Sequence, residues 1–389
     1  MRVFSYILFP IIILIGLIIK KNEKKWCFGS WFGLSYTDNT KYLFLEAVKR
    51  KDVRAIWITK SKEIVKEIRG DGHECYMAYS VRGIAHQLTS GLLFCTVNSR
   101  DLNVFCCVGG RLVQTWHGLP MKKIGFDACK DRAYLYKNLL RSKTIDSYKF
   151  IFSPSSNFDG IFGSAFGVKK EMIKRAPMAR CDGFFVNSGK IKDELGIVDD
   201  KVILYLPTHR DEGKTISEVK RALIALDEAL TSCGFEGHCF YKLHPYDDPL
   251  INGFPEFRSV EYVGSNIDTY NILGVTDILI SDYSSVIFDF ECTKKPIIGF
   301  GLDLENYVKR NRDLYFKPNQ VYKFFASSML ELKVLLKDLD KMKKAGGDYS
   351  YLIDGFSGDK ARKESNSKMI IDDLLKGLSS VDVNISNDA

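Results

Sequence analysis

The hydrophobic positions of the chain fall into short continuous runs, which are separated by stretches with helical spacing. Apolar runs that do not alternate with polar residues are typical of parallel strands, because such strands are covered on both faces. The strands expected in the first part of the chain are 26–30, 53–59, 74–78, 92–97, 111–116 and 149–153. Helical periodicity fits 40–51, 62–69 and 131–140 between them.

The same pattern then starts again. A second series of strands is expected at 201–206, 238–243, 277–281 and 295–300, with a helix at 216–232. The segment 175–200 between the series is polar and rich in turn residues. Two successive series predict an α/β protein with two doubly wound, Rossmann-type domains that face a cleft.

These patterns suggest domain boundaries along the chain. The expected parts are a membrane anchor at 1–22, an N-terminal domain at 23–180, a linker at 181–200, a C-terminal domain at 201–378 and a disordered tail at 379–389.

The N-terminus carries an apolar run from residue 3 to residue 19, followed by the lysine-rich segment KKNEKK. This length reaches the lower range for a transmembrane helix, and the lysines predict that the rest of the chain lies on the cytoplasmic side of the cell membrane. A cleaved signal peptide and a buried or interfacial helix are the alternatives.

The composition excludes some classes of function but does not identify one. The 389 residues are 46% hydrophobic with a net charge of +8, which favours an anionic surface or substrate. No long basic block appears, so nucleic-acid binding is not expected. The ten cysteines, including the adjacent Cys106 and Cys107, show no metal-ligand spacing and predict reduced, buried thiols.

Polar residues gather where the expected strands end. In doubly wound sheets, ligands bind beyond the carboxyl ends of the strands, so these residues are the candidate site. They are His117 after 111–116, Thr208, His209, Arg210 and Asp211 after 201–206, His244 after 238–243, and Asp282, Ser284 and Ser285 after 277–281.

Each of these groups also has a simpler interpretation. The segment 282–285 is either a helix cap or a phosphate site made of hydroxyls and helix amides. Arg210 either lies in a solvated turn or binds phosphate oxygens, and His244 either ends a core strand or donates to a phosphate. Lys122 and Lys123 form a solvated face or contact a phosphorylated acceptor or anionic lipid.

Common nucleotide and metal motifs are missing. The sequence has no P-loop and no GxGxxG opening a helix after a strand, and its aspartate pairs at 199–200 and 247–248 are adjacent residues in turn-like segments. We therefore expect a site that handles phosphate with Arg, His and helix amides, without a cofactor or a required metal.

The strand-end motifs occur in a recognisable order. They are QTWHGLPMKKIGFD (114–127), LYLPTHRD (204–211), YKLHP (241–245), ISDYSSVIFDF (280–290), KKPIIGF (294–300) and DLENY (303–307). Together they resemble the CDP-glycerol:polyglycerophosphate glycerophosphotransferases, the teichoic-acid primase and polymerase family, from about residue 35 to about residue 315.

The resemblance implies a GT-B-like fold and an enzyme of the cytoplasmic membrane face. Such an enzyme transfers glycerol phosphate, or a related polyol phosphate, from CDP-glycerol to a hydroxyl of a membrane-linked acceptor and releases CMP. The product belongs to teichoic acid or to a capsular polymer. CDP-ribitol in place of CDP-glycerol stays open.

The resemblance also implies roles for individual residues. His117 resembles the general base of the WHG motif, which Gly118 completes, while His244 and Arg210 resemble contacts to the donor pyrophosphate. Thr208, Asp282, Ser284, Ser285, Lys122 and Lys123 complete the expected substrate-binding set. The chain departs from the family at His209, where tryptophan is usual, and at 177–182, which retains only Arg180 and Asp182 of the usual segment.

Two other functions fit the same sequence. A GT-B glycosyltransferase would use a nucleotide sugar and release a different nucleotide. A membrane-tethered scaffold with a decayed site would bind no nucleotide, although the retained His117, His244 and Arg210 argue against it.

Overall fold

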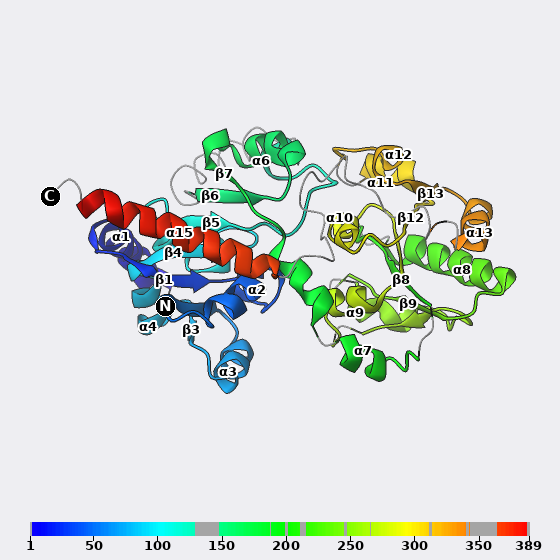
Figure 1. Cartoon of the computed structure of the whole chain (residues 1–389), viewed down its shortest axis with the longest axis horizontal. Coiled ribbons are helices and arrows are strands. Elements are labelled where there is room, and N and C mark those ends of the chain that lie inside the picture. Colours follow the sequence, from blue (N-terminus) through cyan, green and yellow to red (C-terminus); the bar gives the residue numbers. More distant parts are fainter. Residues whose placement is uncertain are drawn as a thin grey trace. The chain divides into compact units, whose positions relative to one another are not determined.

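The computed structural model describes residues 2–128, 148–186, 188–198, 201–210, 215–244, 247–264, 266–310, 313–339, 342 and 364–386. The chain forms two compact α/β units (Figure 1). Unit 1 comprises Met1–His117, Gly125–Asp182 and Lys363–Ala389, and unit 2 comprises Gly118–Ile124 and Gly183–Arg362.

Unit 1 is built on a parallel sheet with the strand order β3-β2-β1-β4-β5-β6-β7. Its strands are β1 (Asn22–Phe28), β2 (Arg54–Thr59), β3 (Cys75–Met77), β4 (Ser90–Cys95), β5 (Leu112–Gln114), β6 (Tyr148–Ser153) and β7 (Ile173–Arg175). The chain order reverses between β1 and β4, and this is the point where doubly wound sheets bind ligands.

Helices complete unit 1. They are α1 (Arg2–Ile18), α2 (Asp38–Ala47), α3 (Lys62–Gly70), α4 (Val81–Thr89), α6 (Asp159–Phe166) and α15 (Asn366–Ser386). The alternate residues Trp26 and Phe28 of β1 join a buried cluster with Leu43 and Phe44 of α2 and Ile371 of α15. The continuous apolar strands therefore have the covered surroundings that the sequence predicts.

Unit 2 has a second parallel sheet, with the order β10-β9-β8-β11-β12-β13. Its strands are β8 (Val202–Leu206), β9 (His238–Tyr241), β10 (Glu261–Tyr262), β11 (Ile278–Ser281), β12 (Ile297–Phe300) and β13 (Phe324–Ala326). Its helices are α7 (Ser188–Glu194), α8 (Thr215–Cys233), α9 (Thr269–Val275), α10 (Val286–Phe290), α11 (Leu304–Arg310), α12 (Pro318–Val321) and α13 (Met329–Lys337). The order reverses between β8 and β11.

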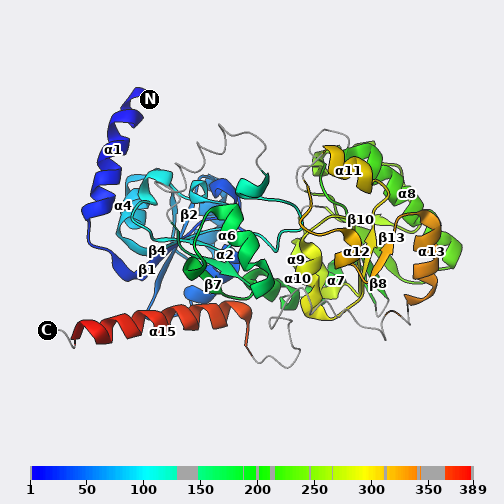
Figure 2. The same ribbon diagram turned by 90° about the horizontal axis from the view of Figure 1, so that it is seen from above.

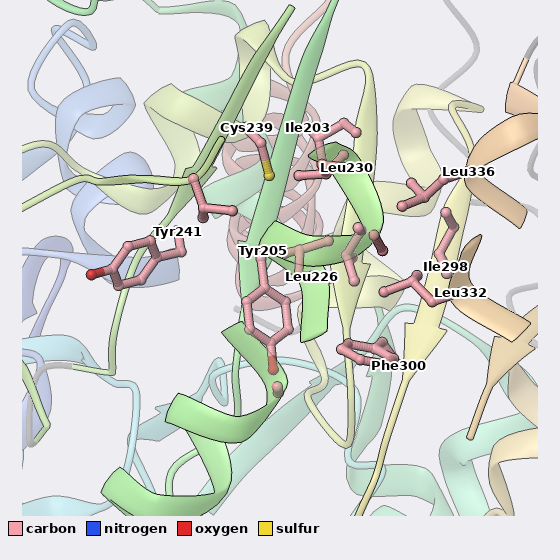
Figure 3. Packing of buried hydrophobic residues seen from close by; sticks show 14 of the residues in the cluster. Ile203, Tyr205, Leu226, Leu230, Cys239, Tyr241, Ile298, Phe300, Leu332 and Leu336 are labelled. Atoms are coloured by element: carbon pink, nitrogen blue, oxygen red, sulfur yellow. The ribbon is translucent and has the colours of Figure 1, made fainter. Parts of the chain in front are cut away.

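The core of unit 2 lies between its strands and the helices α8 and α13. Figure 3 shows Tyr205 and Phe300 from the sheet beside Leu226 of α8 and Leu332 of α13. All of these side chains are buried. This apolar contact fixes the strand ends that carry the candidate donor residues.

The expected elements match the structure best where the apolar runs are long. The short strands β7, β10 and β13 were not expected, and the expected helix at 131–140 lies outside the described residues. The strands β7, β10 and β13 have only two or three residues and lie in no long apolar run, so the sequence pattern does not reveal them.

The expected domain boundaries also need correction. The chain passes from unit 1 to unit 2 after Asp182, so α7 of unit 2 occupies much of the expected linker. The segment from Lys363 returns to unit 1, and α15 continues to Ser386 where a disordered tail was expected.

A half-buried carboxylate, that of Asp182, explains the return of α15. Asp182 accepts hydrogen bonds from the backbone N–H of Asn366 at 2.8 Å and of Ser367 at 2.9 Å, and from the Ser367 hydroxyl at 2.5 Å. Ile370, Ile371 and Leu374 of α15 are buried. The first turn of α15 is thus held in unit 1 by both polar and apolar contacts.

The N-terminal helix α1 has 17 residues and contains Pro10 (Figure 2). Among the described residues, no helix has the length and apolar character needed to cross a membrane, so the expected transmembrane helix is not found. Two of the lysines that follow α1 are used inside unit 1. Lys21 Nζ donates to the carbonyl oxygen of Leu88 at 2.7 Å, and Lys25 Nζ donates to Thr89 Oγ1.

Candidate active site

His117 lies on a tight turn after β5. The preceding Trp116 has φ +53° and the following Gly118 has φ +115°. A positive φ is unusual for a tryptophan, and only glycine readily adopts the value at position 118. Side chains hold this turn, since Gln114 Oε1 accepts from the Trp116 N–H at 2.9 Å and Asn39 Nδ2 donates to the Trp116 carbonyl at 2.8 Å.

The ring of His117 lies against two tryptophans. Its centroid is 5.0 Å from that of Trp31 and 4.0 Å from that of Trp116. Its Nδ1 lies 3.4 Å from the carbonyl oxygen of Thr96. Because a carbonyl oxygen only accepts, this contact favours the tautomer with hydrogen on Nδ1, which leaves Nε2 as the basic nitrogen.

Asp101 organises the loops around His117, and no motif in the sequence indicates this role. Its carboxylate accepts from the N–H groups of Phe32 at 2.8 Å, Thr96 at 2.7 Å and Val97 at 2.7 Å. It therefore joins the loops after β1 and β4, including the loop of Trp31. Burial is the main cause that raises the pKa of Asp101 to about 6, against the opposing effect of these hydrogen bonds.

In unit 2, Arg210 is buried between two carboxylates. Its guanidinium lies 2.7 Å from Asp282 Oδ2 and 3.0 Å from Asp303 Oδ1, and it also donates to the Thr208 carbonyl. Only 7% of Arg210 is exposed, so the solvated-turn interpretation is wrong. Burial disfavours its charge, but the carboxylates outweigh burial and hold the pKa of Arg210 above its usual range.

Aromatic rings complete the surroundings of Arg210. The guanidinium carbon lies 5.6 Å from the ring centre of Tyr283 and 5.5 Å from that of Tyr307. The Tyr283 hydroxyl donates to Asp303 at 3.1 Å. Asp303 and Tyr307 begin and end the DLENY motif, which is the sequence signal that could have marked them as partners of Arg210.

Asp282 links the loops after β8 and β11. Its Oδ1 accepts from the N–H of Thr208 at 2.9 Å and of Tyr283 at 2.7 Å, and the residue is only 1% exposed. Asp282 therefore shapes the strand ends. The hydroxyl of Thr208 is buried and has no hydrogen-bond partner among the described residues.

The serines of the DYSS motif are half-buried at the start of α10. Ser284 Oγ accepts weakly from the Val286 N–H at 3.4 Å, whereas Ser285 makes no side-chain cap. The helix has five residues, so it adds little dipole of its own. What these residues offer a ligand is mainly hydroxyl groups.

The two histidines expected near the donor lie together. The rings of His209 and His244 have centroids 5.3 Å apart and an interplanar angle of 28°. Nδ1 of His209 lies 2.8 Å and 2.9 Å from the two carboxylate oxygens of Asp247. The sequence indicates only a turn at Asp247, and nothing in it connects this residue with His209.

Lys122 and Lys123 belong to the segment Gly118–Ile124, which is part of unit 2. Lys122 makes an antiparallel bridge with Leu314, and its Nζ lies 5.2 Å from the ring centre of Tyr307. Lys123 Nζ pairs with Asp313 at 3.3 Å. The lysines thus contact unit 2, and the chain crosses between the units directly after His117.

In the structure, several of the expected residues of unit 2 fall into two groups. Thr208, Arg210 and Asp282 form one contact network, while His209 and His244 form a neighbouring pair. Asp211 lies outside the described residues.

Two units with parallel sheets, each with polar residues at the point where strand order reverses, define a GT-B-like α/β fold. The family model described as CDP-glycerol:poly(glycerophosphate) glycerophosphotransferase matches residues 11–358. The chain belongs to this family, which confirms the resemblance seen in its motifs.

Known proteins agree with this assignment. The chain is 28% identical over 363 residues to a teichoic acid poly(glycerol phosphate) polymerase of Staphylococcus epidermidis, covering 85% of this chain and 47% of that protein. It is 31% identical over 326 residues to the polymerase of the same description from Bacillus spizizenii, covering 78% of this chain and 80% of that protein. The chain thus spans about half the length of the first relative.

A solved structure of the wall teichoic acid polymerase TagF has a similar fold. The TM-score is 0.74 with 22% sequence identity, over 94% of this chain and 93% of that chain. This similarity supports the GT-B-like fold.

Replacing Arg210 with methionine should destabilise the protein by about 3–5 kcal/mol, because Asp282 and Asp303 would be left buried without a cation. Urea unfolding measures the change. Arg221→Met is the control, since Arg221 is 55% exposed where it pairs with Glu218 and its loss should cost less than about 1 kcal/mol. Equal effects of the two substitutions would show that the carboxylates do not depend on Arg210.

Asp101 should make stability depend on pH. Its pKa is raised from 3.8 to about 6 in the folded state, so the folded state binds the proton more tightly than the unfolded state. Its contribution to stability is therefore greatest at low pH and is lost as pH rises through about 6. The unfolding free energy of wild type minus that of Asp101→Asn should fall by about 1–3 kcal/mol between pH about 4 and 7. A difference that stays constant or rises would contradict this assignment.

Proposed function

We propose that this chain transfers glycerol phosphate, or a related polyol phosphate, from CDP-glycerol to a hydroxyl of a membrane-linked acceptor and releases CMP. The main support is the family match, which spans both units. Within it, the WHG, PTHRD, HP and DYSS motifs all follow strands of parallel sheets. The same match favours a polyol phosphate donor over a nucleotide sugar.

The reaction exchanges one phosphorus–oxygen bond for another. The acceptor oxygen attacks the phosphorus that carries the glycerol, and the bond from this phosphorus to the oxygen of CMP breaks. The acceptor proton passes to Nε2 of His117, and CMP leaves with the bonding electron pair. Such a transition state depends mainly on positioning and on charge stabilisation, which hydrogen-bond donors and cations supply.

The units divide this work in our proposal. Unit 1 supplies the base, His117, whose ring is oriented by Trp31, Trp116 and the Thr96 carbonyl. A neutral imidazole can accept a proton from the acceptor hydroxyl, and histidine is the most common general base in enzymes.

Unit 2 supplies the donor contacts. His244, Ser284 and Ser285 are half-buried at the carboxyl ends of β9 and β11, and they offer an imidazole and hydroxyls to the pyrophosphate. Thr208 adds a buried hydroxyl that has no partner among the described residues. Arg210 acts through Asp282 and Asp303, which differs from the direct phosphate contact expected from the sequence.

The proposal is tested by mass spectrometry of products. Purified protein would be given a lipid-linked acceptor with CDP-glycerol, CDP-ribitol or a UDP-sugar. We expect CMP and an acceptor heavier by one polyol phosphate. Release of UDP with sugar transfer would identify a glycosyltransferase, and an absence of any nucleotide binding would support a scaffold.

Alanine substitution of His117 and of His244 should affect different steps, turnover in the first case and donor binding in the second. His117→Ala should lower kcat by about 100-fold or more, the usual scale for loss of a general base, while CDP-glycerol binding survives. His244→Ala should weaken donor binding by about 10-fold or more, because it loses a charge-assisted hydrogen bond worth about 1.5–3 kcal/mol. Calorimetric binding of CDP-glycerol beside steady-state rates measures both.

His238→Ala is the matched control, since His238 begins β9 and so lies at the opposite end of that strand from His244. It should change neither binding nor turnover. Loss of donor binding in His117→Ala together with normal binding in His244→Ala would reverse the assigned roles.

We also propose that α1 contacts the membrane that carries the acceptor. In the part of α1 whose side chains are described, its apolar surface includes Ile11, Leu14, Ile15, Leu17 and Ile18, which are 42–73% exposed. Gly16 lies on the covered side of α1, beside the side chains of Val108 and Leu88. An exposed apolar face with lysines at its end is typical of a helix that lies in the membrane interface.

Leu14→Glu with Ile18→Glu should reduce co-sedimentation with phosphatidylglycerol vesicles by about 10-fold or more, because each substitution places a charge where an apolar side chain would enter the lipid. Leu330→Glu with Val334→Glu is the control, since these residues are 72% and 58% exposed on α13 of unit 2. Unchanged vesicle binding of the α1 variant would contradict the role of this helix.

A further inference from the structure

A compact cluster of ligating side chains lies at the carboxyl ends of β8 and β9. His209 follows β8, and His244 and Asp247 follow β9. The parallel register pairs Tyr205 of β8 with Tyr241 of β9. Residues shortly after these two strands therefore lie at a similar level along the strand direction. One ligating atom from each of His209, His244 and Asp247 lies within 4.8 Å of the others.

We propose that His209, His244 and Asp247 bind one divalent transition-metal ion and leave coordination positions open to an anionic oxygen. Two imidazoles and one carboxylate are the ligand set of zinc sites with an open position. Mixed nitrogen and oxygen ligands favour ions such as Zn²⁺ and Co²⁺, whereas Mg²⁺ and Ca²⁺ prefer oxygen alone.

The geometry needs only a small adjustment. Ligands about 2.1 Å from a common ion are at most about 4.2 Å apart, so atoms within 4.8 Å must move by less than about 1 Å. The side chain of His209 is 28% exposed, which gives it room to turn, whereas that of Asp247 is 7% exposed and is held in place.

The charge of Asp247 supports the same conclusion. A carboxylate removed from water is unfavourable unless it is hydrogen-bonded or paired with a cation. Asp247 faces His209 Nδ1 with both oxygens, at 2.8 Å and 2.9 Å, so the imidazole and the carboxylate lie close enough to bind one ion once it replaces the hydrogen between them.

Buried cysteine thiols should not compete with the histidine cluster for the ion. Every cysteine in the described part of the chain is a free thiol. Burial raises the pKa of Cys27 to about 11 and that of Cys106 to about 12, so these thiols stay protonated at neutral pH. Since thiolate is the form that binds metal, these two thiols should not compete with the histidine cluster for the ion.

This inference revises an expectation from the sequence. Metal independence was expected because no ligand cluster is visible along the chain, but residues 35 positions apart meet at neighbouring strand ends. Since a tryptophan is usual in the family at position 209, the cluster depends on a residue in which this chain departs from its relatives.

The test uses full-length, tag-free, metal-stripped protein titrated with Co²⁺. We expect one equivalent to bind with the visible spectrum of a four- or five-coordinate ion and no thiolate-to-cobalt charge-transfer band. His209→Gln and Asp247→Asn should each weaken binding by roughly 30-fold or more. Circular dichroism checks that each variant is folded, and His238→Ala should bind Co²⁺ like wild type.

Weak Co²⁺ binding by wild type, or equal binding by folded His209→Gln and Asp247→Asn, would overturn the proposal and leave only an Asp–His hydrogen bond. A second measurement adds CDP to the cobalt protein and rests on the proposed function. A changed spectrum places the open positions at the donor phosphates. An unchanged spectrum overturns that placement but not the metal site, and failure of polyol phosphate transfer overturns only the proposed function.

Discussion

A buried carboxylate holds the strand-end loops together at the reversal of strand order in each unit. In unit 1, Asp101 accepts amide hydrogens from Phe32 after β1 and from Thr96 and Val97 after β4. In unit 2, Asp282 accepts from Thr208 after β8 and from Tyr283 after β11. Parallel strands diverge at this point, and their loops have no ladder partner across the gap. A side-chain acceptor satisfies amides that would otherwise be buried without bonds.

The two carboxylates are stabilised by different means. Asp101 relies on three amide hydrogens, and its raised pKa shows that they do not fully compensate for burial. Asp282 has Arg210 beside it, and Asp303 shares the same guanidinium. A planar fork can serve two carboxylates at once, which a lysine ammonium cannot do with the same geometry. Unit 2 thereby holds its loops through charge, while unit 1 holds the loop of Trp31 and the surroundings of His117 through hydrogen bonds.

The sequence predicted what depends on local pattern. Long apolar runs such as 201–206 identified the strands. Because these strands were expected to be parallel, His117, Thr208 and His244 were expected at the carboxyl-end edges of the sheets. It could not predict contacts that depend on the assembled sheet. Asp101 and Asp247 carry no local signal, since each joins its own loop to a loop that follows another strand, that of Phe32 for Asp101 and that of His209 for Asp247. The return of α15 to unit 1 was not predicted, because it depends on hydrogen bonds from Asn366 and Ser367 to Asp182, a residue far away in the sequence. The N-terminal run was apolar enough to suggest a spanning helix, but Lys21 and Gly16 place the end of α1 against unit 1.

Some motif residues are buried and shape the loops, whereas others are half-buried, and this difference changes how the motifs should be interpreted. The arginine of PTHRD and the aspartate of DYSS pair with each other in the interior, at 7% and 1% exposure. Their first task is to build the loops, and substituting them would disturb any ligand site nearby without proving contact with a ligand. Among the half-buried motif residues of unit 2 are His209, His244, Ser284 and Ser285, which in our proposal present polar atoms to the donor phosphate. Specificity for the donor should therefore depend on these residues, and His209 is the one at which this chain differs from the usual family pattern.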